Sequence, residues 1–519
     1  MNTIESNSIY LRQEKQSIGQ RPLSKVVTTK KRHMVNKLTS VIFSLGLSQT
    51  FVMQALAEKQ VESKPYWNFP QDADATKSTA SHLKFIEIKD KIDIRKTEYR
   101  IRVPENWNGT LISDLDYYHA AESPKYLYLL ERGYAFSGTL RRPERLNHYD
   151  PAHEIHDLVS VLDIFEEKFG KPKRTIQYGC SGGGNVAIGM AEIHPDRIDG
   201  AISAGASTSP WFTNSSLDGF FVLQALIAPD LPIVDLPLHG EAIKAIGEKW
   251  REALDNAQKT SKGRARIALA VTIGQWPGWG GTFGLNAKAS VVEPDAHDED
   301  ALQESMYKAV SLVLPSERTF GHTMLELAAP GQLRWNTDID YREFFKNGNP
   351  LYQNAVLALY KKAGLDLGDD LKQVNASPRV KADPSAIRWW SAPGRTHLGK
   401  PKVPLIRLHD NGDLLVYPSM VRGYESLVAD NGYTELFRSA YVNRAGHCTY
   451  SVAEIAATID TLERRIKSGV WPSTSPDALN ELGKSLKSSD TTKFYEFTSV
   501  KKYNRVWVPT VKDFVGESR

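Results

Sequence analysis

Apolar residues recur along the first half of the chain at two alternating spacings, one typical of helices and the other of short strands. In residues 152–169 the apolar side chains fall three and four positions apart, and Gly170 follows as a stop signal, which predicts a helix. Short β-prone runs around this helix predict strands. These runs are residues 101–103, 110–112, 134–140, 174–178 and 198–206. A further helix is expected over 184–193.

The alternation stops near residue 209 and starts again near residue 400. Between these points, helical stretches stand among loops rich in glycine, proline and tryptophan, at residues 241–258, 300–312 and 351–363. Beyond residue 400 the pattern predicts a strand, a helix, a strand and a last helix, at 403–408, 420–429, 435–442 and 452–468. Ser451 and Glu454 form a capping box for that last helix, and Gly469 ends it.

Strands that alternate with helices indicate the α/β class, with a mostly parallel sheet covered by helices on both faces. The interruption indicates a large inserted lid. We expect the core over residues 58–208 and 400–475, the lid over 209–399, and a C-terminal tail over 476–519 that adds a strand near 493–500. A chain of 519 residues is long enough to bury more than one core.

The charge balance argues against a nucleic-acid partner, although the net charge is +4 and the pI is near 8.6. Residues 1–57 hold eight Lys and Arg residues against two Glu, a net charge of +6 that leaves the remainder at −2. The body of the protein therefore has no excess of cations to neutralise phosphates. No run of about 18 apolar residues offers a membrane span, so we expect no stable membrane insertion of the mature chain.

The basic leader has the parts of a secretory signal peptide over about 34–57. A basic cluster at residues 30–33 precedes a mainly apolar stretch at 38–53, and Ala55 to Ala57 form a small-x-small cleavage site. The expected destination is secreted or periplasmic, with a mature chain that begins near Glu58. A start at Met34 would remove the long extension before the basic cluster, and a disordered or anchoring N-terminus is the alternative reading.

The run Gly179-Cys180-Ser181-Gly182-Gly183 has the form G-x-S-x-G. A predicted strand enters it and a predicted helix leaves it, which is the context of a nucleophile elbow. The serine of such an elbow takes a strained backbone conformation that needs small neighbours. We therefore predict Ser181 as the nucleophile, with the backbone N–H of Gly182 as an oxyanion donor at the helix N-terminus. A plain turn is the alternative.

A nucleophilic serine of this architecture is followed along the chain by an acid and then by a histidine. His447 is the only histidine beyond Asp413, and it stands in a loop before the capped last helix. The loop after the preceding strand offers two carboxylates, Asp410 and Asp413. We prefer Asp413 as the acid because it lies past the glycine turn, deep enough to reach the histidine, and Asp410 remains second.

The chain has two cysteines, and each stands next to a predicted triad residue. Cys180 precedes the serine, and Cys448 follows the histidine. A disulfide between them would tie the nucleophile to its base across the intervening chain, and an oxidising destination would allow it. Two buried free thiols are the alternative.

The remaining candidate residues concern the second oxyanion donor and the substrate wall. After the strand at 110–112 we place the donor at the backbone N–H of Asp116 or Tyr117. In the lid, four tryptophans could form an aromatic wall for an apolar acyl group, although packing of the lid is the more ordinary role for them. They are Trp276, Trp279, Trp389 and Trp390.

At Cys180-Ser181, Asp413 and His447-Cys448 the sequence resembles the tannase and feruloyl esterase family of α/β-hydrolases. The resemblance implies the α/β-hydrolase fold, a secreted serine esterase, a large lid and a disulfide between the neighbours of the serine and the histidine. Members of that family often carry further disulfides and a calcium loop. This chain has one cysteine pair and no acidic loop with EF-hand-like spacing, so we assign no calcium.

The sequence therefore predicts a secreted serine hydrolase that cleaves carboxylic esters through an acyl-enzyme. Its expected partner is a small-molecule ester, with no nucleic acid, no metal and no organic cofactor. A peptidase or amidase of the same fold is the enzymatic alternative, since the same residues can cleave an amide. A non-catalytic extracellular binding module is the other alternative.

Overall fold

A computed structural model describes residues 83–92, 96–141, 149–207, 210–236, 241–281, 292–316, 322–486, 488, 490–498, 500 and 502–509. The chain divides into two compact units, Met1–Asn68 and Phe69–Arg519, and all described residues lie in the second. The predicted leader over 1–57 falls outside the described residues. No helix in the described part is long and apolar enough to cross a membrane.

One sheet runs through the core and has the strand order β1-β2-β4-β3-β5-β6-β7-β8-β9 in the described residues. Strands β3 to β8 are parallel, while β1, β2 and β9 join through antiparallel pairs. This is the sheet of an α/β-hydrolase, and the predicted fold class is confirmed. The strands are β1 (Phe85–Lys91), β2 (Glu98–Pro104), β3 (Thr110–Asp114), β4 (Ala135–Thr139), β5 (Arg174–Cys180), β6 (Gly200–Ala204), β7 (Leu405–Gly412), β8 (Phe437–Ala445) and β9 (Phe494–Tyr495).

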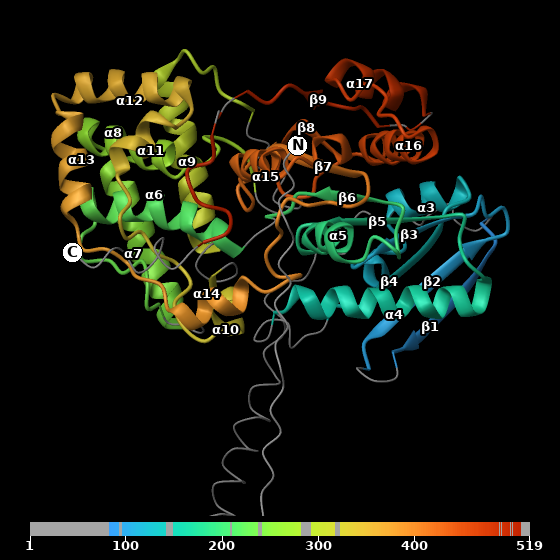
Figure 1. The fold of residues 1–519 in the computed structure, drawn as a ribbon. Coiled ribbons are helices and arrows are strands. Elements are labelled where there is room, and N and C mark those ends of the chain that lie inside the picture. The colour runs from blue at the N-terminus through green and yellow to red at the C-terminus, as the bar shows by residue number, and fades with distance from the viewer. Residues whose placement is uncertain are drawn as a thin grey trace, which may run out of the picture. The chain divides into compact units, whose positions relative to one another are not determined.

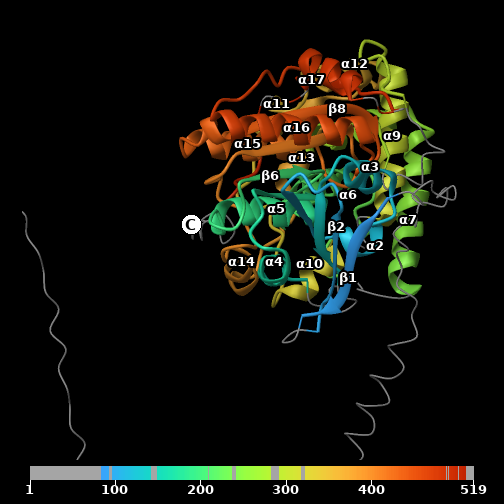
Figure 2. The ribbon, with the colours of Figure 1, turned by 90° about the vertical axis from the view of Figure 1, so that its right-hand side faces the viewer.

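Helices cover both faces of the sheet (Figures 1 and 2). One face carries α4 (Pro151–Phe169), α5 (Gly182–Ile193) and α15 (Ser419–Asp430), whose apolar residues share one buried cluster. The other face carries α3 (Pro124–Glu131) and α16 (Val452–Ser468). The short helix α2 (Tyr117–Ala120) follows β3. The sheet is therefore shielded from water on both sides, as a mostly parallel sheet requires.

The two helices that the sequence predicts most clearly have the expected ends. The Asp150 side chain caps α4 by accepting from the N–H of Ala152, and Gly170 follows the last turn. The capping box of Ser451 and Glu454 is formed at the start of α16, and Gly469 ends it with a φ of 75°. Each cap satisfies N–H or C=O groups that a helix end leaves without partners.

A helical insertion, which corresponds to the predicted lid and is called the lid below, lies between β6 and β7, and Figure 1 shows it beside the sheet. Its central helix α8 is almost fully buried among the others, and the apolar side chains of most of these helices form one cluster. The lid helices are α6 (Thr213–Leu226), α7 (Glu241–Gln258), α8 (Ser261–Ile273), α9 (Glu299–Ser316), α10 (His322–Ala328), α11 (Tyr341–Lys346), α12 (Pro350–Ala363), α13 (Leu367–Ala376) and α14 (Pro384–Trp390), with a 3₁₀ turn at Pro210–Phe212.

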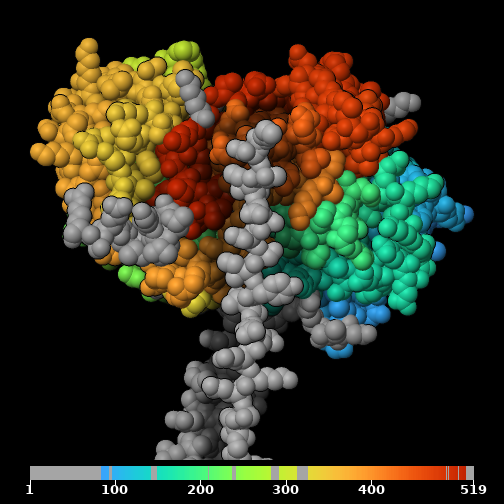
Figure 3. Space-filling model, viewed as in Figure 1, coloured from blue at the N-terminus to red at the C-terminus, as the bar shows by residue number. Residues whose placement is uncertain are grey.

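The C-terminal tail joins both the sheet and the lid. After α17 (Pro476–Ser485), β9 pairs with Tyr441 and Val442 of β8. The predicted strand near 493–500 is in the right place but too long, since β9 covers only Phe494–Tyr495, and beyond it the carbonyl of Phe497 accepts from Arg422 of α15. The end of the described chain, dark red in Figure 3, then packs against the lid. Within this segment Arg505 donates to Asp218 of α6 at 2.8 Å, and both side chains are 2% exposed.

This buried pair gives a test of the tail's contribution to stability. Replacing Arg505 with Met should lower the free energy of unfolding by about 3–5 kcal/mol, because Asp218 would stay buried with an uncompensated charge. Urea unfolding at neutral pH measures the change. Lys484→Ala is the control, since its pair with Glu481 is exposed and contributes at most about 1 kcal/mol. Equal effects of the two variants would contradict the assignment.

Candidate active site

Ser181 stands between β5 and α5 in a conformation rare for a residue with a side chain. Its φ is 58° and its ψ is −122°. Its backbone N–H donates to the carbonyl of Ala204 at 2.9 Å, which fixes the turn against the end of β6. Its side chain does not cap the helix that it begins. The strand, the sharp turn and the helix together form the elbow geometry that presents a nucleophile at the end of a sheet.

The glycines around Ser181 are required by close backbone contacts. A methyl group on Gly179 would lie 2.3 Å from the carbonyl carbon and oxygen of Gly183, and one on Gly184 would lie 2.6 Å from the carbonyl of Ala204. Real side chains do not approach backbone this closely. The packing of the elbow therefore requires glycine at 179, the first position of the G-x-S-x-G run, and at 184, just beyond it.

Asp413 and His447 lie side by side after β7 and β8. The Nδ1 atom of His447 is 2.7 Å from Asp413 Oδ2, and both residues are buried. The other carboxylate oxygen of Asp413 accepts from the backbone N–H groups of Leu415 at 2.8 Å and Val416 at 3.0 Å. With its oxygens held in this way, the carboxylate fixes the orientation of the imidazole and places the Nδ1 proton on the acid side.

Buried His409 contacts the same segment after β7 at the carbonyl of Val416. Burial lowers the pKa of His409 to about 4, so its ring is neutral near pH 7. Its Nε2 lies 2.9 Å from the carbonyl of Val416, to which it donates. Val416, one of the two residues whose N–H groups donate to Asp413, is thus itself held in place by His409.

Asp410, the second candidate acid, contacts a different part of the histidine loop. Its Oδ2 accepts from the N–H of Thr449 at 3.0 Å and from the Thr449 hydroxyl at 3.1 Å. Burial raises the pKa of Asp410 well above its ordinary value. The structure thus sets Asp413 against the imidazole and Asp410 against the backbone that follows it.

A disulfide joins Cys180 to Cys448, with their Cα atoms 6.2 Å apart across a sequence separation of 268. It packs on Gly205, where a methyl group would lie 3.2 Å from one sulfur and 3.4 Å from the other. Consecutive Cα atoms are about 3.8 Å apart, so the chain limits the Cα atoms of Ser181 and His447 to roughly 14 Å at most. The disulfide therefore brings the loops that carry the predicted nucleophile and base into one region.

The predicted oxyanion donors differ in what their amides contact. Gly182 and Tyr117 are the first residues of α5 and α2, so their N–H groups have no acceptor within those helices. The N–H of Asp116 donates to Asp114 Oδ1 at 2.9 Å, so this amide is already occupied. Gly182 and Tyr117 are accordingly the better placed of the three candidates.

Arg141, which no sequence motif singles out, lies beside the elbow. Its Nη2 is 2.6 Å from Asp116 Oδ2 and 3.5 Å from the carbonyl of Cys180. A methyl group on Gly183 would meet the same carboxylate oxygen at 3.3 Å. The Arg141–Asp116 ion pair therefore links the loop after β3 to the nucleophile turn.

The four predicted tryptophans have different surroundings. Trp276 and Trp390 are buried and donate their indole N–H groups to the carbonyls of Ser215 and Leu325, which commits them to packing the lid. The guanidinium of Arg395 lies over the ring of Trp389, with its central carbon 3.9 Å from the ring centroid. Trp279 packs against residues 412–416, which carry Asp413 and are called the acid loop below; a methyl group on Gly412 would lie 2.9 Å from its ring. Trp276 and Trp279 both line a cavity of about 230 Å³ between lid and core.

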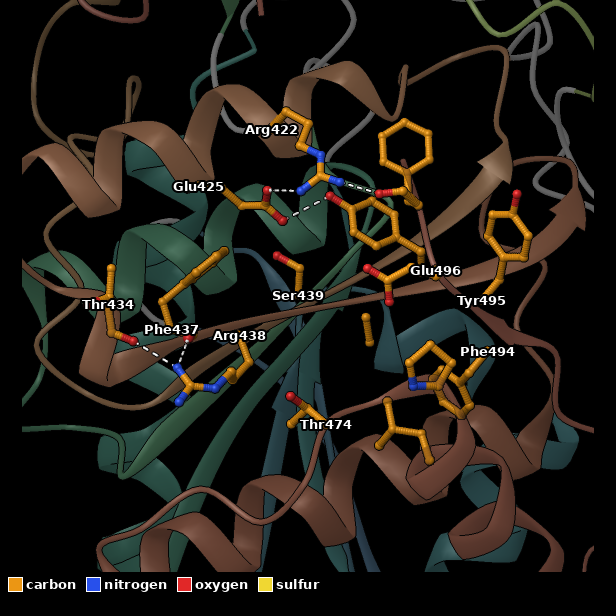
Figure 4. Close-up of a pocket in the computed structure, with 15 residues that line it drawn as sticks. Arg422, Glu425, Thr434, Phe437, Arg438, Ser439, Thr474, Phe494, Tyr495 and Glu496 are labelled. Carbon is orange, nitrogen blue, oxygen red and sulfur yellow. Dashed lines mark hydrogen bonds and ion pairs between the residues drawn. The ribbon is translucent and has the colours of Figure 1, made fainter. Parts of the chain in front are cut away.

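A second cavity, of about 390 Å³, lies at the outer edge of the sheet between β8, β9 and α17 (Figure 4). Two of its charged groups pair with each other, since Arg422 donates to Glu425 at 2.9 Å, and Glu425 also accepts from the hydroxyl of Tyr441 at 2.9 Å. None of the predicted triad residues lines it. This cavity is therefore not a candidate for the catalytic pocket.

An o-phthalyl amidase from Xanthobacter agilis is 40% identical to the chain over 457 residues, which cover 83% of the chain and 99% of that protein. The chain belongs to the family of this amidase. No known family model matches the chain. The prediction of a hydrolase is thereby confirmed, while the narrower assignment to carboxylic esters and to the tannase group is not, because this relative is named an amidase.

Solved structures similar to this member of the amidase family include two enzymes of Aspergillus oryzae. An esterase is 13% identical with a TM-score of 0.38, covering 75% of this chain and 81% of that chain. Feruloyl esterase B is 12% identical with a TM-score of 0.37, covering 75% of this chain and 82% of that chain. At these TM-scores the likenesses are too distant to bear on substrate or mechanism.

The disulfide offers a test of how the loops are held. Replacing Cys448 with Ser should lower hydrolytic activity by roughly 100-fold, because the histidine loop would lose its covalent tether to the nucleophile turn. Initial rates of the variant and of the wild type, each with and without a thiol reductant, measure the effect. The control is the double replacement of Cys180 and Cys448, in which a reductant should change nothing further. Full activity of Cys448→Ser would contradict an essential tether.

Proposed function

We propose that the protein is a serine hydrolase that cleaves amides of an aromatic, phthalyl-type acid through an acyl-enzyme. The observation that carries the proposal is the 40% identity to an o-phthalyl amidase across nearly all of that protein. The strained Ser181 and the hydrogen-bonded pair of His447 and Asp413 supply the chemistry. Esters of the same acid are second substrates, because the Cys-Ser and His-Cys motifs resemble those of esterases and a serine nucleophile attacks either carbonyl.

In the proposed mechanism Ser181 Oγ attacks the acyl carbonyl while His447 Nε2 takes the hydroxyl proton. Asp413 stabilises the imidazolium that forms and holds its Nδ1–H. The negative oxygen of the tetrahedral intermediate accepts from the N–H groups of Gly182 and Tyr117. His447 then gives its proton to the leaving amine. In the second half of the reaction His447 takes a proton from water, the water attacks the acyl-enzyme, and the proton returns to Ser181 Oγ as the carboxylic acid leaves.

Replacing Ser181 with Ala tests the nucleophile and the bond cleaved. The variant should lose more than about a thousandfold in kcat/KM towards an o-phthalyl amide and towards the matching p-nitrophenyl ester. It should also escape labelling by a fluorophosphonate probe that labels the wild type. Wild-type protein that cleaves neither substrate and takes up no probe would favour a non-catalytic binding module. Wild-type protein that cleaves only peptide amides would favour a peptidase.

The two buried aspartates make a matched pair for assigning the acid. Asp413→Asn should lower kcat on the order of 10³–10⁴-fold, because an amide in place of the carboxylate cannot stabilise the imidazolium. Asp410→Asn should cause a much smaller loss, since an amide oxygen can still accept from Thr449. Steady-state kinetics on the amide substrate measure both. The reverse order of effects would make Asp410 the acid.

We also propose that the mature protein works outside the cytoplasm. The disulfide supports this location, because such bonds persist mainly in oxidising compartments. The basic and apolar leader supports it as well. Mass analysis of the exported protein should find a new N-terminus near Glu58, and an intact N-terminus on cytoplasmic protein would contradict the proposal.

A further inference from the structure

Residues 275–281 connect the lid helix α8 to the edge of the acid loop. Gly281 of this segment forms a parallel bridge with Asp413 itself. Its N–H donates to the carbonyl of Gly412 at 3.0 Å, and its carbonyl accepts from the N–H of Leu414 at 3.0 Å. The lid thus holds the backbone on both sides of the predicted triad acid.

The carbonyl of Gly412 also accepts from the histidine loop. The N–H of Gly446 reaches it at 3.0 Å, the same distance as the N–H of Gly281. One oxygen therefore ties together the loop of the acid, the loop of His447 and the lid. A displacement of any one of the three segments would alter the hydrogen bonds of the other two.

The approach of the lid to the acid loop leaves no spare space. Gly280 has a φ of 129°, and a methyl group there would lie 2.0 Å from the carbonyl of Gly412. The ring of Trp279 closes over the same glycine. Only glycine fits at 280, because any side chain would push the lid and the acid loop apart.

The other end of the segment is fixed to the core helix α15, the tail and the lid helix α12. The carbonyl of Gln275 accepts from the hydroxyl of Ser419 at 3.3 Å, and its side chain donates to the carbonyl of Lys502 at 2.6 Å. The N–H of Gly278 donates to the hydroxyl of Tyr352 in α12 at 2.7 Å. The segment is therefore held at both ends. A shift of the lid relative to the core would move its contact with the acid loop.

We propose that residues 275–281 form a positioning segment for the triad acid, so that the lid must be seated on the acid loop for Asp413 to hold His447. The inference rests on the proposed triad. In this role Gly280, Gly281 and Trp279 act through Asp413, so they are positioning residues. The lid then has a catalytic task beyond covering the substrate, because it completes the support of the acid.

Gly280→Ala tests this role directly. The added methyl should lower kcat roughly 100-fold, as expected for a misplaced catalytic group, with KM little changed. It should also weaken or shift the downfield proton NMR signal of the hydrogen bond between His447 Nδ1 and Asp413. The matched control is Gly364→Ala, also in the lid and at positive φ, where nothing lies within 4 Å of the added methyl. The control should keep both the wild-type kcat and the signal.

A second pair of variants decides the matter if Gly280→Ala fails to fold. Trp279→Ala should lower kcat and disturb the same signal, and Trp279→Phe, which keeps a ring over Gly412, should restore most of both. Wild-type kcat and an unchanged signal in Gly280→Ala or Trp279→Ala would overturn the inference. An effect on KM alone would also overturn it, because it would indicate a substrate contact.

The failure of this inference differs from the failure of the proposed function. If Ser181→Ala is inactive while the lid variants keep the wild-type kcat, the result supports the proposed nucleophile and contradicts the positioning role of residues 275–281. If Ser181→Ala keeps full activity, the proposed function falls, and the proton signal still shows whether the segment holds Asp413 against His447.

Discussion

The covalent link between Cys180 and Cys448 is the constraint on which the geometry of the candidate site depends. Each of its ends adjoins strained backbone, since Ser181 has a φ of 58° and Cys448 itself has a φ of 61°. Residues held in this region cost free energy and persist only where their surroundings determine them. The disulfide supplies part of that determination by holding two loops that are far apart in sequence against the same glycine, Gly205. The backbone strain at Ser181 and at Cys448 is thus maintained in part by one bond, together with the hydrogen bond from Ser181 to Ala204.

The rest of the site is supported mainly by backbone groups. Asp413 is held by two amides, Asp410 holds the amide of Thr449, and the carbonyl of Gly412 receives two more. Such contacts need close approach, which explains why glycines stand at several of the contact points. A site supported in this way depends less on the rotamers of long side chains and more on how the loops pack.

The sequence predicts the elements that carry local signals. Helices α4 and α16 have amphipathic faces and capping residues, and the elbow has a strand, a glycine-rich turn and a helix in order. Strand β1 was not predicted because it is an edge strand with mostly exposed, charged residues, so it lacks an apolar pattern. Helix α8 was not predicted because it is buried on nearly all sides, which removes the contrast between faces.

Contacts between distant segments leave no local signal, and these decide the details of the site. The sequence pattern places Asp410 and Asp413 in one loop, but Asp410 lies within β7 and Asp413 just after it, and the two side chains contact different parts of the segment around His447. The bridge between Gly281 and Asp413 joins a lid loop to a core loop, and the role of Arg141 depends on a partner in another loop. Periodicity and motif spacing contain no information about such pairings, since these are set by the packing of the whole domain.

The ion pair between Arg505 and Asp218 has a consequence for synthesis of the chain. Asp218 belongs to the first helix of the lid, and its partner stands 287 positions later. While the chain is still on the ribosome, the buried carboxylate of Asp218 lacks the guanidinium that donates to it at 2.8 Å in the folded protein. The insertion therefore gains this ion pair only after nearly the whole protein has been made, so its last contact forms after synthesis of the sheet domain.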